Sequence, residues 1–260
     1  MKPALDVSHN PYYPMKKPPL AALCRRMATA KAAVKAAVAT TLLCILPQNT
    51  AAQSYTFANY QKYAEANKAL GKPSKKDKRV VFLGNSITEH WAAKRPEYFK
   101  THGYIGRGIS GQTSYQLLLR FREDVIMLQP TVVVIGIGTN DIAENTGKYV
   151  EDYTFGNIVS MVELAKSNHI KPVLAALLPA KDIPWRPDLK GIMGKIRSLN
   201  ARLQAYAKAQ RIPYIDYFTP LLAPDGSGMD GRYTPESVHP NEAGYAVMEA
   251  IVTPVVEKLR

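Results

Sequence analysis

From Arg79 onward, short apolar segments alternate with longer amphipathic ones, and this alternation restricts the possible fold more than any other feature. The clearest short segment, Thr131-Val132-Val133-Val134-Ile135, is rich in the β-branched residues that favour β-strands. We expect strands over residues 79–84, 104–108, 131–137, 171–178 and 212–216. We expect helices near residues 89–100, 114–126, 148–168, 190–209 and 241–259, with a further helix before them at 54–72. Such alternation predicts an α/β fold, in which helices cover both faces of a parallel sheet.

Two segments at the start of the chain differ from the rest. Residues 1–26 are rich in Pro, Tyr and Lys and lack apolar periodicity, which predicts either disorder or a non-native extension. In residues 27–52, two lysines precede an apolar run over 36–46, and small residues follow up to Ala52. This order is typical of a secretory signal peptide, and the run is too short to span a bilayer. We therefore expect cleavage near Ala52, export to a periplasm or out of the cell, and a single domain over 53–260.

The net charge of +13 does not by itself indicate a nucleic-acid partner. Residues 1–52 contribute +6 (7 − 1), and residues 53–260 contribute +7 (27 − 20) from scattered side chains. Because no aromatic residues alternate with the basic ones, we expect no nucleic-acid binding. Both cysteines, Cys24 and Cys44, precede the expected cleavage point, so the mature domain would contain no disulfide. The bulky Leu43 before Cys44 argues against lipid attachment, and we expect no stable membrane anchor.

Polar and glycine-rich residues follow the predicted strands, at the edge where an open α/β sheet binds its ligands. Ser86 follows the first strand, Gly111 the second and Asn140 the third. A nucleophilic serine needs a base, a group that orients the base and donors for the oxyanion. His239, in the last loop before the final helix, is the best-placed base. His90 is expected to point along its helix rather than back at the Ser86 hydroxyl. For Ser86 alone, capping of the following helix is an equally good explanation.

Four sequence blocks taken together resemble those of the SGNH (GDSL-type) hydrolase family. The blocks are Gly84-Asn85-Ser86-Ile87-Thr88, Gly111 within Ile-Ser-Gly-Gln-Thr-Ser, Gly138-Thr139-Asn140-Asp141, and Glu236-Ser237-Val238-His239-Pro240-Asn241. The resemblance extends over residues 79 to 257, which is nearly all of the expected mature chain. It implies a flavodoxin-like three-layer α/β/α fold with a five-stranded parallel sheet. It also implies hydrolysis of esters by a serine, with no metal and no cofactor.

The resemblance assigns a role to each matching residue. Ser86 would be the nucleophile, His239 the general base and Glu236 the acid that orients it. The oxyanion hole would use the backbone N–H groups of Ser86 and Gly111 and the side-chain amide of Asn140. Glycine permits close approach of a ligand, and an amide is a neutral donor. Ordinary turn chemistry is the alternative explanation for Gly111 and Asn140.

Two positions depart from the usual pattern of the family. Asn85 stands where the family has Asp, which removes a charge beside the nucleophile. Glu236 also stands where the family has Asp, and its side chain is one methylene longer. Either the loop has adjusted to the longer acid or Asp230 orients His239 instead, and we favour Glu236.

The loop after the fourth strand carries Trp185 and Arg186, which either bind substrate or anchor the loop. A flat aromatic face suits sugar rings as well as acyl chains. We therefore expect an exported esterase that removes short acyl groups, such as acetyl, from small-molecule or carbohydrate esters. The alternatives are a longer-chain lipase, lysophospholipase or thioesterase, and an inactive carbohydrate-binding relative. Nucleotide binding is disfavoured, because Gly136-x-Gly138 lacks a third glycine. The sequence leaves the oligomeric state open.

Overall fold

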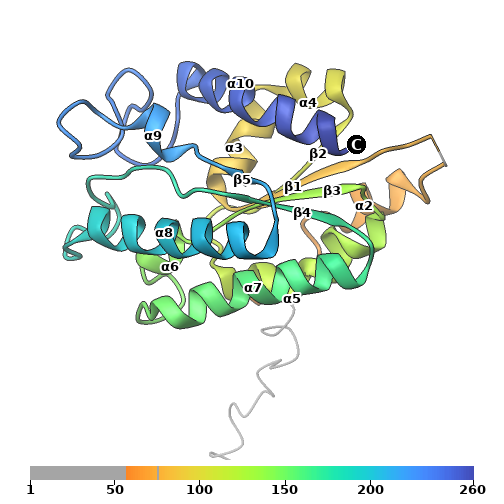
Figure 1. The fold of residues 1–260 in the computed structure, drawn as a ribbon, viewed down its shortest axis with the longest axis horizontal. Coiled ribbons are helices and arrows are strands. Elements are labelled where there is room, and N and C mark those ends of the chain that lie inside the picture. The colour runs from red at the N-terminus through yellow and green to blue at the C-terminus, as the bar shows by residue number, and fades with distance from the viewer. Residues whose placement is uncertain (1–56, 75) are drawn as a thin grey trace, which may run out of the picture. The chain divides into compact units, whose positions relative to one another are not determined.

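The computed structural model describes residues 57–74 and 76–260, and these contain a five-stranded parallel sheet (Figure 1). The strands lie in the order β2-β1-β3-β4-β5. They are β1 (Val80–Gly84), β2 (Tyr104–Gly108), β3 (Val132–Gly136), β4 (Lys171–Ala175) and β5 (Tyr214–Ile215). All four neighbouring pairs are parallel, which confirms the predicted fold class. The segments expected to be an extension (1–26) and a signal peptide (27–52) lie outside the described residues.

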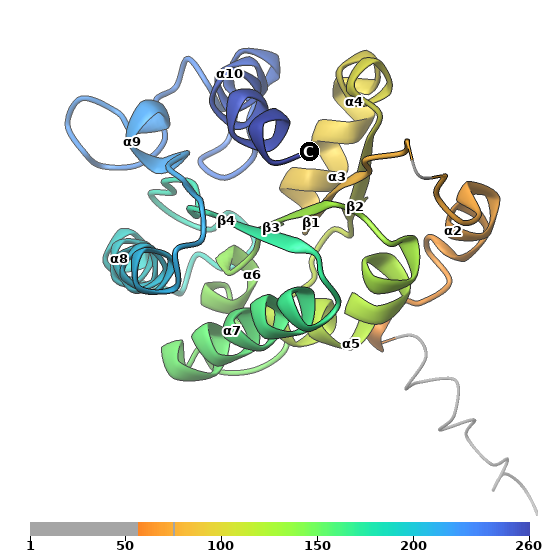
Figure 2. The ribbon, with the colours of Figure 1, turned by 45° about the vertical axis from the view of Figure 1, so that its right-hand side comes forward.

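Helices cover both faces of the sheet, and the alternation of side chains along each strand explains why both faces are apolar. The helices are α2 (Ala64–Leu70), α3 (Ser86–Lys94), α4 (Pro96–His102), α5 (Ser114–Asp124), α6 (Thr139–Ile142), α7 (Glu151–Ser167), α8 (Ile192–Gln210), α9 (Phe218–Leu221) and α10 (Glu242–Leu259), with a 3₁₀ turn η2 (Ile126–Leu128). Val81 and Leu83 pack in the core beneath α5, α7 and α8. Val80 and Phe82 pack in the core beneath α3, α4 and α10. Figure 2 shows these two helical layers on opposite sides of the strands.

The order of the strands determines where a ligand can bind. The chain passes from β1 to β2 on one side and then crosses to β3 on the other, so β1 lies between them. The loops that leave β1 and β3 therefore diverge to opposite faces, which opens a crevice at their carboxyl ends. Ser86 follows β1 and Asn140 lies in α6, directly after β3. The fold thus places two of the predicted site residues at this switch point.

Several predicted boundaries were wrong, each for an identifiable local reason. The single helix expected near 89–100 is two helices, α3 and α4, because Pro96 begins a new helix and cannot continue the old one. Within the described part of the helix expected over 54–72, α2 covers only Ala64–Leu70, and Asn59 before it has a positive φ of 54°. The strand expected over 171–178 ends at Ala175, since the Asn200 side chain instead bonds both Leu177 backbone groups.

No helix in the described ranges is long and apolar enough to cross a membrane.

Candidate active site

Ser86 is the first residue of α3 and lies directly beyond the carboxyl end of β1. Asn85 caps the helix, and its Oδ1 accepts a hydrogen bond of 3.0 Å from the Ile87 N–H. The turn requires glycine at position 84, since a Cβ there would lie 2.2 Å from Thr88 Oγ1 and 2.9 Å from the Gly136 carbonyl oxygen. Asn85 therefore performs the capping that an aspartate could also perform, without adding a negative charge beside Ser86.

Ser86, His239 and Glu236 form a continuous hydrogen-bonded series. Ser86 Oγ lies 2.8 Å from His239 Nε2, and His239 Nδ1 lies 2.5 Å from Glu236 Oε1. An ionised carboxylate can only accept, so Nδ1 carries the proton and Nε2 faces the Ser86 hydroxyl as an acceptor. His239 lies in the loop before α10, where Thr234 Oγ1 donates to its carbonyl oxygen at 2.8 Å. The series therefore leaves the imidazole ready to receive the serine proton.

The longer side chain of Glu236 fits because the loop turns back on itself. Ser237 has a φ of +66°, a left-handed conformation that is uncommon outside glycine. Glu236 Oε1 accepts from the His239 backbone N–H at 2.8 Å as well as from the ring. Asp230, the alternative acid, instead holds Arg232, and the two side chains come within 2.8 Å. Its hydrogen bonds from Arg232 lower the pKa of the Asp230 carboxyl. The geometry thus pairs His239 with Glu236.

The predicted oxyanion donors lie on three neighbouring segments. The N–H of Ser86 belongs to the first turn of α3, whose N–H groups have no partner within the helix. Gly111 adopts a φ of +78°, and Asn145 Nδ2 donates to its carbonyl oxygen at 3.0 Å. Asn140 is buried, and its Nδ2 donates to the Gln112 carbonyl oxygen at 2.9 Å. This bond fixes the Asn140 amide beside the loop that carries Gly111.

Glu89 connects α3 to the loop of Gly111. Its Oε2 accepts hydrogen bonds of 2.6 Å from both the N–H and the Oγ of Ser110. Its Oε1 pairs with Lys62 at 2.7 Å. The peptide unit that precedes the Gly111 nitrogen is therefore attached to the helix that carries Ser86.

A buried arginine supports the same region from below. The guanidinium of Arg120, on α5, is fully buried and donates to Gln112 Oε1 at 2.6 Å. It also donates to the carbonyl oxygens of Gly84 and Arg107, each at 3.0 Å, and pairs with Asp124 at 2.7 Å. Arg120 thereby connects the ends of β1 and β2 to the loop after β2. Sequence reasoning missed this residue, because an arginine on an amphipathic helix normally faces solvent.

His90 packs against the proposed base, a contact that was not predicted from the sequence. Its ring centroid lies 4.9 Å from that of His239. Burial lowers the pKa of His90, and the nearby His239 lowers it further. Ser86 and His90 are four residues apart on α3. Residues with this separation lie on the same face of a helix, so the sequence could have placed His90 near the catalytic residues.

Trp185 and Arg186 are adjacent in sequence but have different surroundings. Trp185 is 40% exposed, and the centroid of its ring lies 6.1 Å from that of His239. Its Nε1 donates to Asn145 Oδ1 at 3.1 Å. Arg186 donates to the Ala143 carbonyl oxygen at 2.8 Å and pairs with Asp188 and Glu144. The structure thus places Trp185 beside His239, and Arg186 against Ala143 and Glu144.

The arrangement suits activation of a hydroxyl. Within the described ranges, no group of three or more His, Cys, Asp or Glu side chains could hold a metal ion. A serine, an imidazole and a carboxylate in series are instead the parts of a serine hydrolase. The fold and this series together define the class as an α/β/α hydrolase with a serine at the carboxyl edge of the sheet.

The chain belongs to the GDSL-like lipase/acylhydrolase family, whose model matches residues 82–247. This confirms the predicted family and the predicted enzyme class, a hydrolase of ester bonds. A crystal structure of a GDSL-like lipase from Bacteroides thetaiotaomicron is 58% identical, with a TM-score of 0.77. That similarity covers 78% of this chain and 100% of the other.

Two further comparisons show lower identity or cover a smaller share of the chain. The crystal structure of an acetyl xylan esterase is 25% identical, with a TM-score of 0.58, over 68% of this chain and 99% of the other. The uncharacterized lipoprotein YqeF of Bacillus subtilis (strain 168) is 33% identical over 78 residues. The match covers 29% of this chain and spans only about a third, 32%, of that curated relative.

Proposed function

We propose that the protein is an exported serine esterase that removes short acyl groups, such as acetyl, from small-molecule or carbohydrate esters. The observation that carries this proposal is the series Ser86–His239–Glu236, with separations of 2.8 and 2.5 Å. It lies at the switch point of the sheet, beside Asn140 and the Gly111 loop. Family membership supplies the ester as the class of bond.

In the proposed reaction, Ser86 Oγ attacks the ester carbonyl carbon while His239 Nε2 takes the hydroxyl proton. The carbonyl oxygen gains negative charge, which the Ser86 N–H, the Gly111 N–H and the Asn140 amide stabilise. Glu236 stabilises the imidazolium that forms. His239 then gives its proton to the leaving alcohol oxygen, and the acyl group stays on Ser86. A water, deprotonated by His239, attacks this acyl-enzyme and releases the carboxylic acid and free Ser86.

The aromatic side chain at the rim of the site supports the proposal that the alcohol half of the ester is a carbohydrate. Trp185 is partly exposed and stacks beside His239, the residue that would protonate the leaving alcohol. A flat ring at this place can pack against a sugar ring. The similarity to an acetyl xylan esterase points in the same direction. Export is proposed from the signal-like residues 27–52, and the Bacillus relative is named a lipoprotein.

The test compares acetate release from acetylated xylo-oligosaccharides with hydrolysis of p-nitrophenyl acetate. Trp185→Ala should raise KM for the oligosaccharides about tenfold and leave the small ester nearly unchanged, while Trp185→Phe should keep much of the carbohydrate activity. Equal effects on both substrates would refute the sugar-binding role. A preference for decanoate over acetate would favour a longer-chain lipase. No hydrolysis of any ester would favour an inactive carbohydrate-binding relative.

A further inference from the structure

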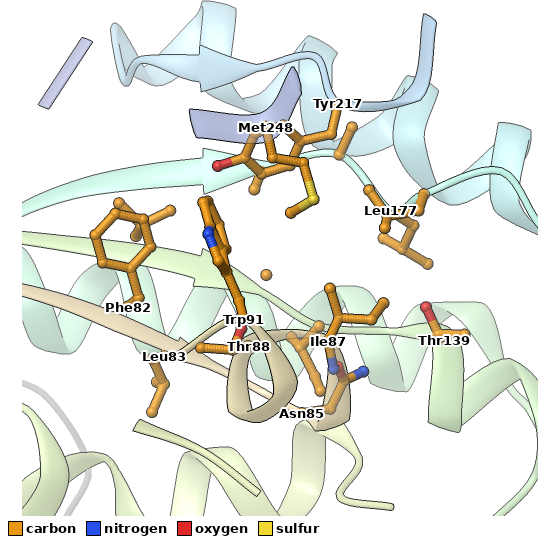
Figure 3. A pocket seen from close by; sticks show the side chains of 16 residues that line it. Phe82, Leu83, Asn85, Ile87, Thr88, Trp91, Thr139, Leu177, Tyr217 and Met248 are labelled. Carbon is orange, nitrogen blue, oxygen red and sulfur yellow. The ribbon is translucent and has the colours of Figure 1, made fainter. Parts of the chain in front are cut away.

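A mainly apolar cavity lies between the sheet and the helical layer that contains α3 and α10 (Figure 3). About 40 Å³ of it is open to the centre of a water-sized sphere, whereas one water needs roughly 10–15 Å³ on this measure. Its wall includes the carboxyl ends of β1, β3 and β4. The side chains that shape it include Phe82, Ile87, Trp91, Leu177, Tyr217 and Met248. The cavity therefore has room for a small apolar group.

Sequence neighbours of the candidate catalytic residues line the cavity. Asn85 and Ile87, on either side of Ser86 in sequence, both line it. Thr139, the residue before Asn140, lines it as well. In Figure 3 these three side chains lie on one side of the cavity, with Met248 and Tyr217 opposite them. The cavity thus lies against the segments that carry Ser86 and Asn140, although neither of these two residues lines it.

The two halves of an ester would face different surroundings at this site. His239 must protonate the leaving alcohol oxygen, and beside His239 lies the exposed ring of Trp185. The alcohol half therefore belongs on the solvent side. The acyl half extends from the carbonyl carbon in another direction, and the apolar space that we assign to it is the cavity lined by Asn85 and Ile87.

The far wall sets a limit on what the cavity accepts. Met248 and Trp91 are each 2% exposed, so neither can move aside into solvent. Within the described part of the chain, the hydroxyl of Tyr217 is buried without a hydrogen-bond partner. Burial raises the pKa of this phenol, so it stays neutral. An unpaired hydroxyl makes the deep end less favourable for a long aliphatic chain than a fully apolar wall would be.

We propose that this cavity is the acyl pocket, and that Met248, Trp91 and Tyr217 restrict the enzyme to short unbranched acyl groups such as acetyl and butyryl. The proposal rests on the esterase function proposed above. It assigns acyl length to the cavity wall rather than to the catalytic residues. Burial of each additional methylene is favourable until the chain meets this wall.

The experiment measures kcat/KM for p-nitrophenyl acetate, butyrate and hexanoate, which share one leaving group. In the wild type, kcat/KM should fall sharply between butyrate and hexanoate. Met248→Ala lengthens the cavity and should raise the hexanoate-to-acetate ratio at least tenfold. The matched control is Val252→Ala, which removes a fully buried side chain from the same helix but away from the cavity. That variant should unfold at a lower temperature yet keep the wild-type ratio.

A second variant keeps the proposal testable if Met248→Ala does not fold. Tyr217→Phe removes the unpaired hydroxyl with almost no change in volume, and should raise the hexanoate-to-acetate ratio and the thermal unfolding temperature. Folded variants that retain the wild-type ratio would overturn the acyl pocket, as would an equal change in Val252→Ala. A wild type without any Ser86-dependent hydrolysis would instead overturn the esterase function, and the pocket with it.

Discussion

At the scale of single residues, Glu236 shows how the loop accommodates a candidate catalytic acid that is one methylene longer than aspartate. The loop turns through a left-handed Ser237, and Glu236 Oε1 then receives both the ring and the backbone N–H of His239. From the sequence, the acid that orients His239 could be either Glu236 or Asp230, and the turn at Ser237 could not be predicted. Only the structure shows that Asp230 is occupied by Arg232.

Glu236→Gln should lower kcat by about 10³–10⁴-fold, because an amide can hold the imidazole in the wrong tautomer, as the equivalent change does in a serine protease. His239→Ala should lower kcat further, to about 10⁶-fold below the wild type. Steady-state kinetics on p-nitrophenyl acetate measures both. Asp230→Asn is the control and should retain nearly full activity. Wild-type activity in Glu236→Gln together with loss in Asp230→Asn would reverse the assignment.

Asn140→Ala should lower kcat by about 10²–10³-fold and leave KM nearly unchanged, because an oxyanion donor acts mainly in the transition state. The same steady-state assay separates the two constants. The Asn140 amide also donates to the Gln112 carbonyl oxygen, so thermal unfolding should confirm that the variant folds. A rise in KM at constant kcat would refute the oxyanion role.

His90 should make the free energy of unfolding depend on pH. Its pKa is lowered in the folded protein from the ordinary 6.5, first by burial and then by His239. The unfolded chain therefore takes up the proton at a higher pH, and stability falls as pH decreases below about 6.5. Lys94 opposes its protonation as well, whereas Glu89 and Glu236 favour it. Urea denaturation at pH 7.5 and 5.5 should show a smaller loss in His90→Gln than in the wild type. An identical loss in both would contradict this account.

At the scale of elements, the site depends on three segments that converge at the carboxyl edge. Arg120 on α5 contacts the ends of β1 and β2 and the loop after β2. Glu89 on α3 holds the same loop from the other side through Ser110. The candidate catalytic residues were predictable because they follow strands in recognisable blocks. These supporting residues were not, since a charged side chain on a helix gives no sign in the sequence that it is buried or bonded to a loop.

Arg120→Met should destabilise the protein by about 3–5 kcal/mol, because it removes the charged partner of the buried Asp124 carboxylate and leaves only the hydrogen bond from Asn67. Chemical denaturation followed by circular dichroism would measure the loss. Arg122→Met is the matched control, since Arg122 lies on the same helix but is exposed, and it should change stability by less than about 0.5 kcal/mol. Equal losses in the two variants would show that the buried network adds nothing.

At the scale of the whole molecule, the alternation of strands and helices was sufficient to predict the parallel sheet and its five strands. It was not sufficient for every boundary. The break at Pro96 between α3 and α4 could have been predicted from the chemistry of proline, although a single helix was predicted there. The early end of β4 could not be predicted, because it depends on Asn200 of α8, a residue distant in sequence. The periodicity of apolar residues therefore predicted which helices and strands form. It did not predict the boundaries that depend on contacts with residues distant in sequence.

The substrate depends on features of several elements at once. The apolar cavity combines three strands, α3, α10 and Tyr217, and no segment of the sequence indicates it alone. The aromatic rim at Trp185 was visible as a residue in a loop, but its position beside His239 required the fold. Motif blocks thus predicted the chemistry of the site, while acyl length and the alcohol half depend on packing.

We propose that Ser86 is the nucleophile of an ester hydrolase. The most direct measurement is the hydrolysis of p-nitrophenyl acetate by the purified wild type and by Ser86→Ala, with Ser160→Ala on α7 as a control. Wild type and Ser160→Ala should be equally active, and Ser86→Ala should lose about 10⁶-fold in kcat. Ester hydrolysis that survives in Ser86→Ala would contradict the account.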